Sequence, residues 1–398
     1  MIYLDNAATT KPEKEVIDAI MPYLTDDWYN PSSLYSKAKA VRSEVDKARN
    51  NIARFIGAKP DELYFTSGAT ESNNWVIRGF IDYCLSYQIK PVVITSTIEH
   101  KSITSCVAGM YSVHPFLFDS YKVNVDKNGF VDLNHLDLIL SSIKKEYSNN
   151  YLVLVSIQYA NSEIGTIQHI NDIAHFVHQY KGIFHTDATQ ALCHIPIHVG
   201  FEGIDLLSAS AQKCGGLKGT GILYKNKNCH CIKPLIYGSQ ENGERGGTEN
   251  VVGIIAMSKA VDCCQNIKTN IGATIKDRNY FVYQLVTKFD CKVNGIIGDY
   301  LYGFFDNRLP NNINVTFPQN ITGEALIYML DSAGIMISSG SACNSNTNKP
   351  SRVLQAIGLS NEEIERTVRI TLPDDITIGE INTVVNEIDK VIKVLTEN

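Results

Sequence analysis

Apolar segments with strand character alternate with helical segments along the first two thirds of the chain. We predict strands at residues 62–66, 91–96, 151–157, 182–186 and 205–211. The segments between them, such as 170–180, have apolar residues at helical spacing. This alternation indicates an α/β fold, in which helices cover both faces of a mostly parallel sheet.

Polar residues follow the predicted strands at the points where the strands end. They are His100, Asn161, Ser162, Asp187 and Lys213. Ligands of open α/β sheets bind beyond the carboxyl ends of the strands, which is where these residues would meet. We therefore expect a single binding site along this edge of the sheet.

Lys213 follows a strand of apolar and small residues and shortly precedes two glycines. A lysine at the end of a buried strand is poorly solvated, which favours the neutral amine, a nucleophile toward carbonyl groups. Taken alone, this stretch fits a surface lysine after an edge strand better. The polar residues at the ends of the other predicted strands favour the interpretation of Lys213 as a nucleophile.

Residues 67–72, Ser-Gly-Ala-Thr-Glu-Ser, join a predicted strand to a predicted helix. A glycine turn with hydroxyl groups at the start of a helix can hold a phosphate, because free N–H groups and the helix dipole favour an anion. Serine or threonine followed by glutamate is also ordinary helix-capping chemistry. The sequence leaves both alternatives open.

A lysine, an aspartate, a histidine and a phosphate cradle on one sheet edge point to pyridoxal phosphate. Lys213 would bind the aldehyde of the cofactor, Asp187 would pair with its ring nitrogen, and His100 would stack on the ring. Arg369, on a predicted strand at 368–372, would bind an α-carboxylate. Individually, Asp187 also fits a helix cap, His100 an ordinary histidine and Arg369 a surface charge.

Residues 338–351 contain no apolar side chain large enough to anchor them, which predicts a loop outside any core. Cys343 would be exposed on this loop. Exposed thiols are usually avoided in proteins, so its presence suggests a nucleophile. An incidental cysteine is the alternative.

Composition excludes several classes of protein. The 398 residues carry a formal net charge of −6 and no apolar run long enough to span a bilayer, so we expect a cytoplasmic protein without direct nucleic-acid or membrane binding. The ten scattered cysteines fit reduced thiols better than a disulfide framework. Cys229-His230-Cys231 looks like metal ligands but lacks a second ligand pair, so we expect no metal site.

The pattern of predicted helices and strands changes after about residue 255, where the predicted strands become shorter, as at 313–317. We predict a large cofactor-binding domain at residues 16–255. A smaller α+β domain at residues 256–398 would carry the Cys343 loop. Residues 1–15 are expected to pack with the small domain.

Several motifs together resemble those of cysteine desulfurases of the nitrogen-fixation and iron–sulfur cluster type, in the class V aminotransferase-like family. The matching segments are 3–10, 30–33, 65–74, 99–100, 163–165, 187–190, 245–250 and 338–343. The resemblance covers nearly the whole chain. It implies the pyridoxal-phosphate-dependent transferase fold of type I, with a mostly parallel, seven-stranded sheet.

The resemblance implies a role for each matching residue. Lys213 and Cys343 would be catalytic, and His100 would also move protons. Asn6 would help Arg369 to bind the substrate carboxylate. The implied cofactor-binding residues are Ala69, Thr70, His100, Ser162, Asp187, Gln190, Ser210, Gln212, Lys213 and Thr248. The last of these would reach the phosphate held by a neighbouring subunit, which implies a homodimer.

The implied activity converts L-cysteine to L-alanine and leaves the sulfur as a persulfide on Cys343, for transfer to an iron–sulfur scaffold or a thiolation enzyme. Cys343 could also ligate an iron–sulfur cluster transiently. Gln212, Ser162 and Tyr35 depart from the family pattern, which has histidine, asparagine and histidine there. The alternatives are a selenocysteine lyase, another class V pyridoxal enzyme, or a catalytically degenerate sulfur-transfer scaffold.

Overall fold

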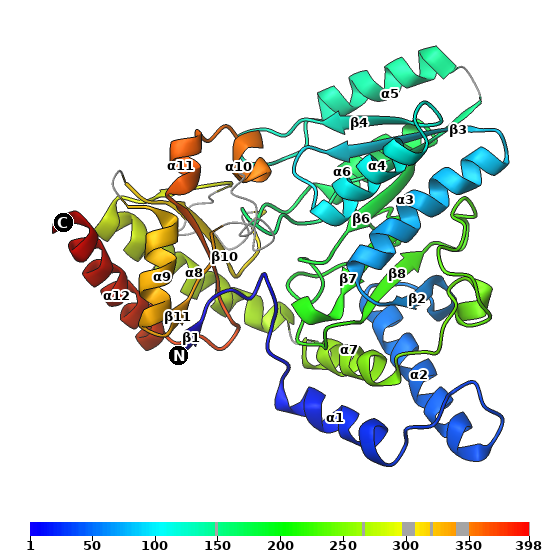
Figure 1. Ribbon diagram of the computed structural model, residues 1–398, viewed down its shortest axis with the longest axis horizontal. Helices are drawn as coiled ribbons and strands as arrows, with labels where there is room; N and C mark the ends of the chain where they lie inside the picture. Colours follow the sequence, from blue (N-terminus) through cyan, green and yellow to red (C-terminus); the bar gives the residue numbers. More distant parts are fainter. Residues whose placement is uncertain (148–149, 265–266, 297–306, 319–320, 340–349, 398) are drawn as a thin grey trace.

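The computed structural model describes residues 1–147, 150–264, 267–296, 307–318, 321–339 and 350–397. It has two parts, a larger one built on a wide twisted sheet and a smaller one that contains the C-terminal segment (Figure 1). Both termini lie in the smaller part. Among the helices within these ranges, none is both long enough and apolar enough to cross a lipid bilayer.

The larger sheet has seven strands within the described residues. In spatial order they are β2 (Leu63–Thr66), β8 (Gly221–Lys225), β7 (Leu206–Ser210), β6 (Ile183–Asp187), β5 (Tyr151–Ser156), β3 (Lys90–Ser96) and β4 (Asp119–Val123). Neighbouring strands from β7 to β4 are parallel, whereas β8 is antiparallel to both of its neighbours. The predicted α/β fold with a mostly parallel seven-stranded sheet is confirmed.

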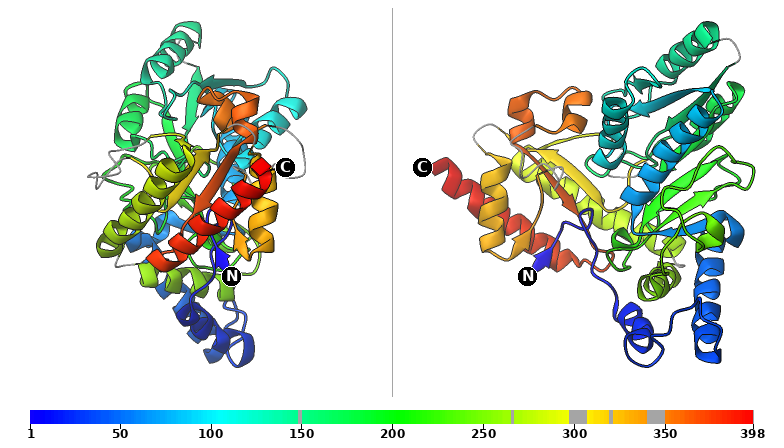
Figure 2. Two further views of the ribbon diagram at one scale, coloured as in Figure 1. Left: turned by 90° about the vertical axis from the view of Figure 1, so that its left-hand side faces the viewer. Right: turned by 45° about the vertical axis from the view of Figure 1, so that its right-hand side comes forward.

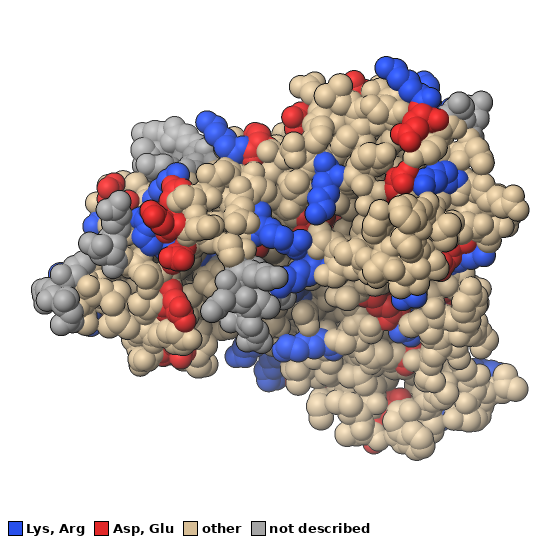
Figure 3. Space-filling model, turned by 45° about the horizontal axis from the view of Figure 1, so that its top comes forward, with Lys and Arg blue, Asp and Glu red and all other residues tan. Residues whose placement is uncertain are grey.

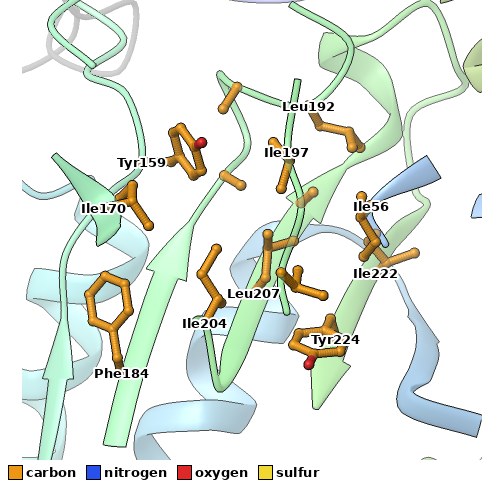
Figure 4. Close-up of a cluster of buried hydrophobic side chains, with 14 of the residues drawn as sticks. Ile56, Tyr159, Ile170, Phe184, Leu192, Ile197, Ile204, Leu207, Ile222 and Tyr224 are labelled. Carbon is orange, nitrogen blue, oxygen red and sulfur yellow. The ribbon is translucent and has the colours of Figure 1, made fainter. Parts of the chain in front are cut away.

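Helices cover both faces of this sheet because successive strand residues point to opposite sides. The helices of the larger part are α1 (Lys14–Thr25), α2 (Ser36–Phe55), α3 (Ala69–Ser86), α4 (Lys101–Val113), α5 (Leu133–Tyr147), α6 (Ile170–Gln179) and α7 (Val251–Cys263). On β3, Val93 packs with α3 and α4, while Val92 and Ile94 pack with α2, α5, α6 and α7. Figure 4 shows the second of these cores, where Phe184, Leu207 and Tyr224 come from three strands.

Three 3₁₀ turns complete the larger part, η1 (Pro60–Glu62), η2 (Ala211–Lys213) and η3 (Glu241–Gly243). Of these, η2 directly follows β7 and ends at Lys213. Helix α1 stands apart from the sheet and packs on α7 through Val16 and Ile20. Helix α7 thereby holds the first long helix of the chain against the larger part.

The smaller part has its own core around an antiparallel sheet. The strands of this sheet, in spatial order, are β12 (Thr367–Thr371), β10 (Asn312–Thr316) and β9 (Lys292–Val293). Its helices are α8 (Ile267–Phe289), α9 (Gly323–Ser332), α10 (Arg352–Ala356), α11 (Asn361–Glu365) and α12 (Ile378–Glu397). Residues of β10, β12, α9 and α12 form one apolar cluster. Figure 2 shows α9 and α12 beside these strands in both views.

The N-terminal segment joins the two parts. Strand β1 (Ile2–Tyr3) pairs in parallel with β11 (Ile335–Met336), and Leu4 is fully buried in the core of the smaller part. The chain then crosses to α1, as Figure 1 shows in dark blue. The domain boundaries near residues 15 and 255 stay predictions.

Candidate active site

A cavity of about 440 Å³ opens at the carboxyl ends of β3, β5, β6 and β7. Most of the residues predicted to form the site line it. They are Ala69, Thr70, His100, Ser162, Asp187, Gln190, Ser210, Gln212, Lys213 and Arg369. Because the strands are parallel here, their ends bring together residues that are far apart in the sequence.

Lys213 ends the η2 turn, and its amine points toward the N-terminal segment. Nζ donates to the carbonyl oxygens of Ala7, at 2.7 Å, and of Ala8. On the other side, the carbonyl of Lys213 lies 3.0 Å from Nε2 of His194. The sequence did not predict the contact with residues 7 and 8, because it is made to backbone atoms.

Asp187 is the last residue of β6 and is buried. Its Oδ2 accepts a 2.7 Å hydrogen bond from Nδ2 of Asn73, which lies on α3. Its Oδ1 accepts from the backbone N–H of Thr189, at 3.0 Å. The carboxylate is therefore fixed by two donors, and its position next to Gln190 and Lys213 in the cavity wall suits a partner for a ring nitrogen.

His100 is the N-cap residue of α4. Its Nδ1 accepts from the backbone N–H of Ser102 at 3.1 Å, so the proton of the neutral ring is on Nε2. The surrounding protein lowers the pKa of His100, chiefly by desolvating the charged form. Oγ of Ser102 also lies 2.8 Å from Nδ1 of His100 and accepts from Asn73. Asn73 and Ser102 thus connect Asp187 with His100.

The start of α3 forms one end of the cavity. Its first turn leaves backbone N–H groups that can bind an anion, and Gly68 precedes it without a side-chain cap. Gly68 and Gly221 lie so close that a Cβ on Gly221 would be 2.5 Å from Cα of Gly68. Glu71 accepts from the N–H of Ser67 at 2.8 Å and pairs with Arg245 at 2.8 Å. The close approach of Gly68 and Gly221 leaves room only for small residues beside the start of α3, as a phosphate cradle requires.

Four cationic side chains line the cavity, Lys101, Lys213, Arg352 and Arg369. Figure 3 shows Lys and Arg side chains gathered along the middle of one face. Four acidic residues also line the cavity, but burial raises the pKa of Glu99 to about 8 and also raises the pKa of Glu163. Because burial makes the charged form of these two carboxyl groups less favourable while four cationic side chains line the cavity, the cavity suits an anionic ligand.

Arg369 comes from β12 of the smaller part and is buried. Its Nη2 pairs with Oδ1 of Asp5 at 2.6 Å, and its Nη1 donates to the carbonyl of Ser162 at 3.2 Å. Its Nε is buried and has no hydrogen-bond partner within the described residues. The guanidinium is thus held in place by two of its five N–H donors, and the Nε donor is among those left for a ligand.

Buried polar atoms in the cavity wall fit a polar cofactor. Oγ1 of Thr97 and Oγ1 of Thr189, like Nε of Arg369, have no hydrogen-bond partner among the residues that the structure describes. A buried polar atom without a partner is costly, so a ligand that pairs with such atoms would stabilise this wall. With the glycine contact at Gly68 and the anion-favouring cavity, the residues present fit pyridoxal phosphate.

Two of the predicted residues lie outside the lining of this cavity. Nδ2 of Asn6 donates to the carbonyl of Thr371 at 2.9 Å, and Asn6 lines a neighbouring cavity. Thr248 is exposed. Cys343 lies outside the described residues. The exposed position of Thr248 leaves it free to contact a second subunit, and its role stays a prediction.

Sequence reasoning assigned no role to Asn73, Glu99 or Arg352, although all three belong to the site or support it. Asn73 and Glu99 stand inside matching segments, at 65–74 and 99–100, which is the signal that could have found them, and the structure buries both. Arg352 begins α10, directly after the loop predicted at 338–351, where a lone arginine carries no signal of its own.

Comparison with known proteins agrees with this geometry. The family model for class V aminotransferases matches residues 2–384. The chain is 39% identical over 396 residues to a cysteine desulfurase IscS of Dictyoglomus turgidum, which covers 99% of this chain and 95% of the relative.

Two solved structures are also similar over nearly their whole length. One, a NifS-like protein, has a TM-score of 0.86 at 30% identity, with 99% of this chain and all of that chain covered. The other, described as SspA in complex with cysteine, has a TM-score of 0.76 at 32% identity, with 94% and 99% covered. The chain therefore belongs to the class V aminotransferase family and, within it, to the cysteine desulfurases of the IscS and NifS type.

Proposed function

We propose that this protein uses pyridoxal phosphate to convert L-cysteine to L-alanine and that Cys343 takes up the sulfur. The observation that carries the proposal is the convergence of Lys213, Asp187, His100 and Arg369 on one cavity that favours anions. A cationic arginine from the smaller part and a lysine from the larger part meet there. This arrangement suits a small amino acid bound between the two parts.

The cofactor would be held by residues of the larger part. Lys213 would bind its aldehyde carbon, Asp187 its ring nitrogen and Gln190 its phenolic oxygen. Its phosphate would lie against the start of α3, near Ala69, Thr70, Ser210 and Gln212, with Thr248 of a second subunit completing the cradle. When bound, pyridoxal phosphate supplies an electron sink for bond breaking at the substrate Cα.

The side chains around the substrate would then act in turn. Arg369 would bind the carboxylate of L-cysteine through its buried Nε and one Nη atom, which orients the Cα–H bond. Lys213 would take the Cα proton. His100, with its proton on Nε2, would exchange a proton with the substrate on the opposite wall, and its lowered pKa keeps the ring neutral at neutral pH.

Sulfur transfer would require the thiolate of Cys343. The substrate Cβ–Sγ bond would break while a bond forms between the substrate sulfur and Cys343. The electron pair of the broken bond would stay with the carbon skeleton, which would take up a proton at Cβ in place of the one lost from the substrate thiol, so the products would be L-alanine and a Cys343 persulfide. An acceptor protein would then take the terminal sulfur. We place the reaction in the cytoplasm, because a free thiolate needs a reducing compartment. A homodimer would complete each site through Thr248.

The test combines the visible spectrum of the full-length protein with assays of alanine and sulfide. We expect the wild-type protein to bind the cofactor, to change its spectrum on addition of L-cysteine and to form both products. Cys343→Ala should keep the spectral response but lose at least about 100-fold in turnover, the scale on which a catalytic nucleophile acts. Cys263→Ala, which changes an exposed cysteine on α7, is the matched control.

Several outcomes would contradict the proposal. Full alanine release by Cys343→Ala would remove Cys343 from the reaction. A spectral change without sulfide would point to another amino acid, and faster turnover of selenocysteine would favour a selenocysteine lyase. Absence of cofactor binding would favour the degenerate scaffold.

A further inference from the structure

A second thiol site lies at the edge of the large sheet opposite to the cavity. Cys229 and Cys231 follow β8, which runs antiparallel to β7, so they lie near the start of β7 and not near its end at Lys213. Their Sγ atoms are 3.5 Å apart. The site is therefore separate from the proposed desulfuration chemistry.

The backbone on both sides of the pair is held by hydrogen bonds. The N–H of Cys229 donates to the carbonyl of Asn226 at 2.8 Å, which closes a tight turn. Beyond the pair, Lys233 is fixed to α3, because its N–H donates to Gly79 at 3.1 Å and its carbonyl accepts from Nε1 of Trp75 at 2.9 Å. The fold of this segment therefore holds the two sulfur atoms close together.

The two thiols are not equivalent. Cys229 is buried, whereas Cys231 is partly exposed and accessible to a reactant. The pKa of Cys231 is lowered, mainly by the hydrogen bond from Cys229, and the pKa of Cys229 is raised by the same contact. A more exposed thiol with a lowered pKa beside a buried thiol is the arrangement of a nucleophilic and a resolving cysteine.

A third cysteine nearby does not turn this pair into a metal site. Cys84 on α3 belongs to the same apolar cluster, but burial raises its pKa to about 12, so it remains a neutral thiol. Within the described part of the chain, no group of three or more His, Cys, Asp or Glu residues could hold a metal ion. Two thiols in contact without a third ligand suit thiol–disulfide exchange.

We propose that Cys229 and Cys231 form a redox-active dithiol that reacts with low-molecular-weight disulfides. The Cys231 thiolate attacks one sulfur of the disulfide, so that a mixed disulfide forms and one thiolate leaves. Cys229 then attacks the Cys231 sulfur, which forms the Cys229–Cys231 disulfide and releases the second thiol. From the thiolate–thiol form the protein loses two electrons and one proton, and the small disulfide becomes one thiolate and one thiol.

The reaction should be reversible. Only one residue separates the two cysteines, and a disulfide that closes so small a ring is strained and more easily reduced than a structural one. The segment that contains the two cysteines is anchored on α3 through Trp75 and Gly79. Formation of the Cys229–Cys231 disulfide would therefore also act on α3, whose first turn faces the cavity.

The experiment uses the full-length protein loaded with cofactor, reduced, and then exposed to glutathione disulfide. After free thiols are alkylated, trypsin releases the peptide 228–245, which contains Cys229 and Cys231 and no other cysteine. We expect this peptide to lose both alkylation sites together and to carry an internal disulfide. Added dithiothreitol should restore both sites.

Single variants test the order of attack. In Cys229→Ser, Cys231 should accumulate a glutathione adduct, because the thiol that would resolve the mixed disulfide is absent. In Cys231→Ser, Cys229 should stay unmodified in the folded protein because it is buried. The wild-type peptide gives an answer even if a variant does not fold.

Two results would overturn the proposal. One is a wild-type protein in which peptide 228–245 keeps both alkylated thiols while Cys263 is modified. The other is modification of Cys231→Ser at the wild-type rate. Neither result would bear on desulfuration, which is measured separately as alanine release.

Discussion

Nδ2 of Asn73 lies 2.7 Å from Oδ2 of Asp187 and donates a hydrogen bond to it. The same nitrogen lies 2.8 Å from Oγ of Ser102, which contacts the ring of His100. One fully buried amide on α3 therefore positions both the carboxylate expected at the ring nitrogen of the cofactor and the histidine expected to stack on the ring. Asn73 acts through its neighbours and is a positioning residue.

Asn73→Ala should weaken cofactor retention by about 10–100-fold, because a hydrogen bond to a charged group contributes about 1.5–3 kcal/mol. The measurement is the dissociation constant of pyridoxal phosphate, followed by absorbance. Asn74→Ala is the matched control, since Nδ2 of Asn74 donates to the carbonyl of Thr70, at 2.9 Å. Equal loss in both variants, or loss that follows the melting temperature alone, would contradict a positioning role.

Arg369→Lys should raise KM for L-cysteine by about 10–100-fold, because a lysine cannot offer two parallel donors to a carboxylate. The spectrum of the bound cofactor should stay unchanged. Steady-state kinetics of alanine release check this result. Arg366→Lys is the control, because Arg366 binds the carbonyl of Phe317 just before β12. Unchanged KM in Arg369→Lys would show that the carboxylate is bound elsewhere.

Gly221→Ala should destabilise the protein and weaken cofactor binding. The new Cβ would lie 2.5 Å from Cα of Gly68 and 2.6 Å from the carbonyl oxygen of Ala209, and both are backbone atoms that cannot yield easily. Overpacking of this kind costs about 1–3 kcal/mol. Thermal melting with and without cofactor measures the effect.

The control for this substitution is Gly109→Ala, at a helical position on α4 where a Cβ meets nothing within 4 Å. It should be neutral or stabilise the protein by about 0.5–1 kcal/mol, the gain in helix propensity. A Gly221→Ala protein that melts like Gly109→Ala would refute the close approach of β8 to Gly68.

Stability should fall as pH rises because of Glu99. Burial raises the pKa of its carboxyl in the folded protein to about 8, against 4.5 for the ordinary group. Between these values the folded state keeps a proton that the unfolded state releases, so the free energy of unfolding decreases by up to about 1.4 kcal/mol per pH unit. The loss is complete above the folded pKa.

Glu99→Gln should remove this slope, because the amide is neutral at every pH. Melting temperatures of the cofactor-free protein, measured from about pH 5.5 to pH 8.5, would reveal the change. The exposed Glu365→Gln should retain the wild-type dependence. A slope that persists in Glu99→Gln would mean that another group binds the proton.

The strands that the sequence predicted are those with a long apolar run between turn residues. Strand β5 at Tyr151–Ser156 is such a run. Two strands of the larger sheet were missed, as were the two-residue strands β1, β9 and β11. Strand β8, at Gly221–Lys225, follows a glycine-rich turn and offers only three apolar residues in a row, while β4, at Asp119–Val123, is an edge strand whose polar residues face solvent. The apolar run of β8 and the alternation of β4 are too short to separate these strands from a loop.

The same limit applies to the site. Strand ends identify Asp187 and Lys213 because topology places such residues together. The partners of these residues follow no such rule, since Asn73 lies 114 positions before Asp187 and Ala7 contacts Lys213 through a backbone oxygen. Packing between distant segments selects these pairs, and no local pattern records it.

The contacts between the N-terminal segment and β12 affect the order in which the protein can fold during synthesis. Asn6 binds the carbonyl of Thr371, 365 positions later, and Asp5 pairs with Arg369 on the same strand. A ribosome synthesises Asp5 and Asn6 more than 360 residues before it reaches Arg369 and Thr371. The sheet with Lys213 can form on the growing chain, whereas Arg369, the proposed carboxylate-binding residue, reaches the cavity only after β12 has emerged, so amino-acid binding as proposed has to wait for this strand.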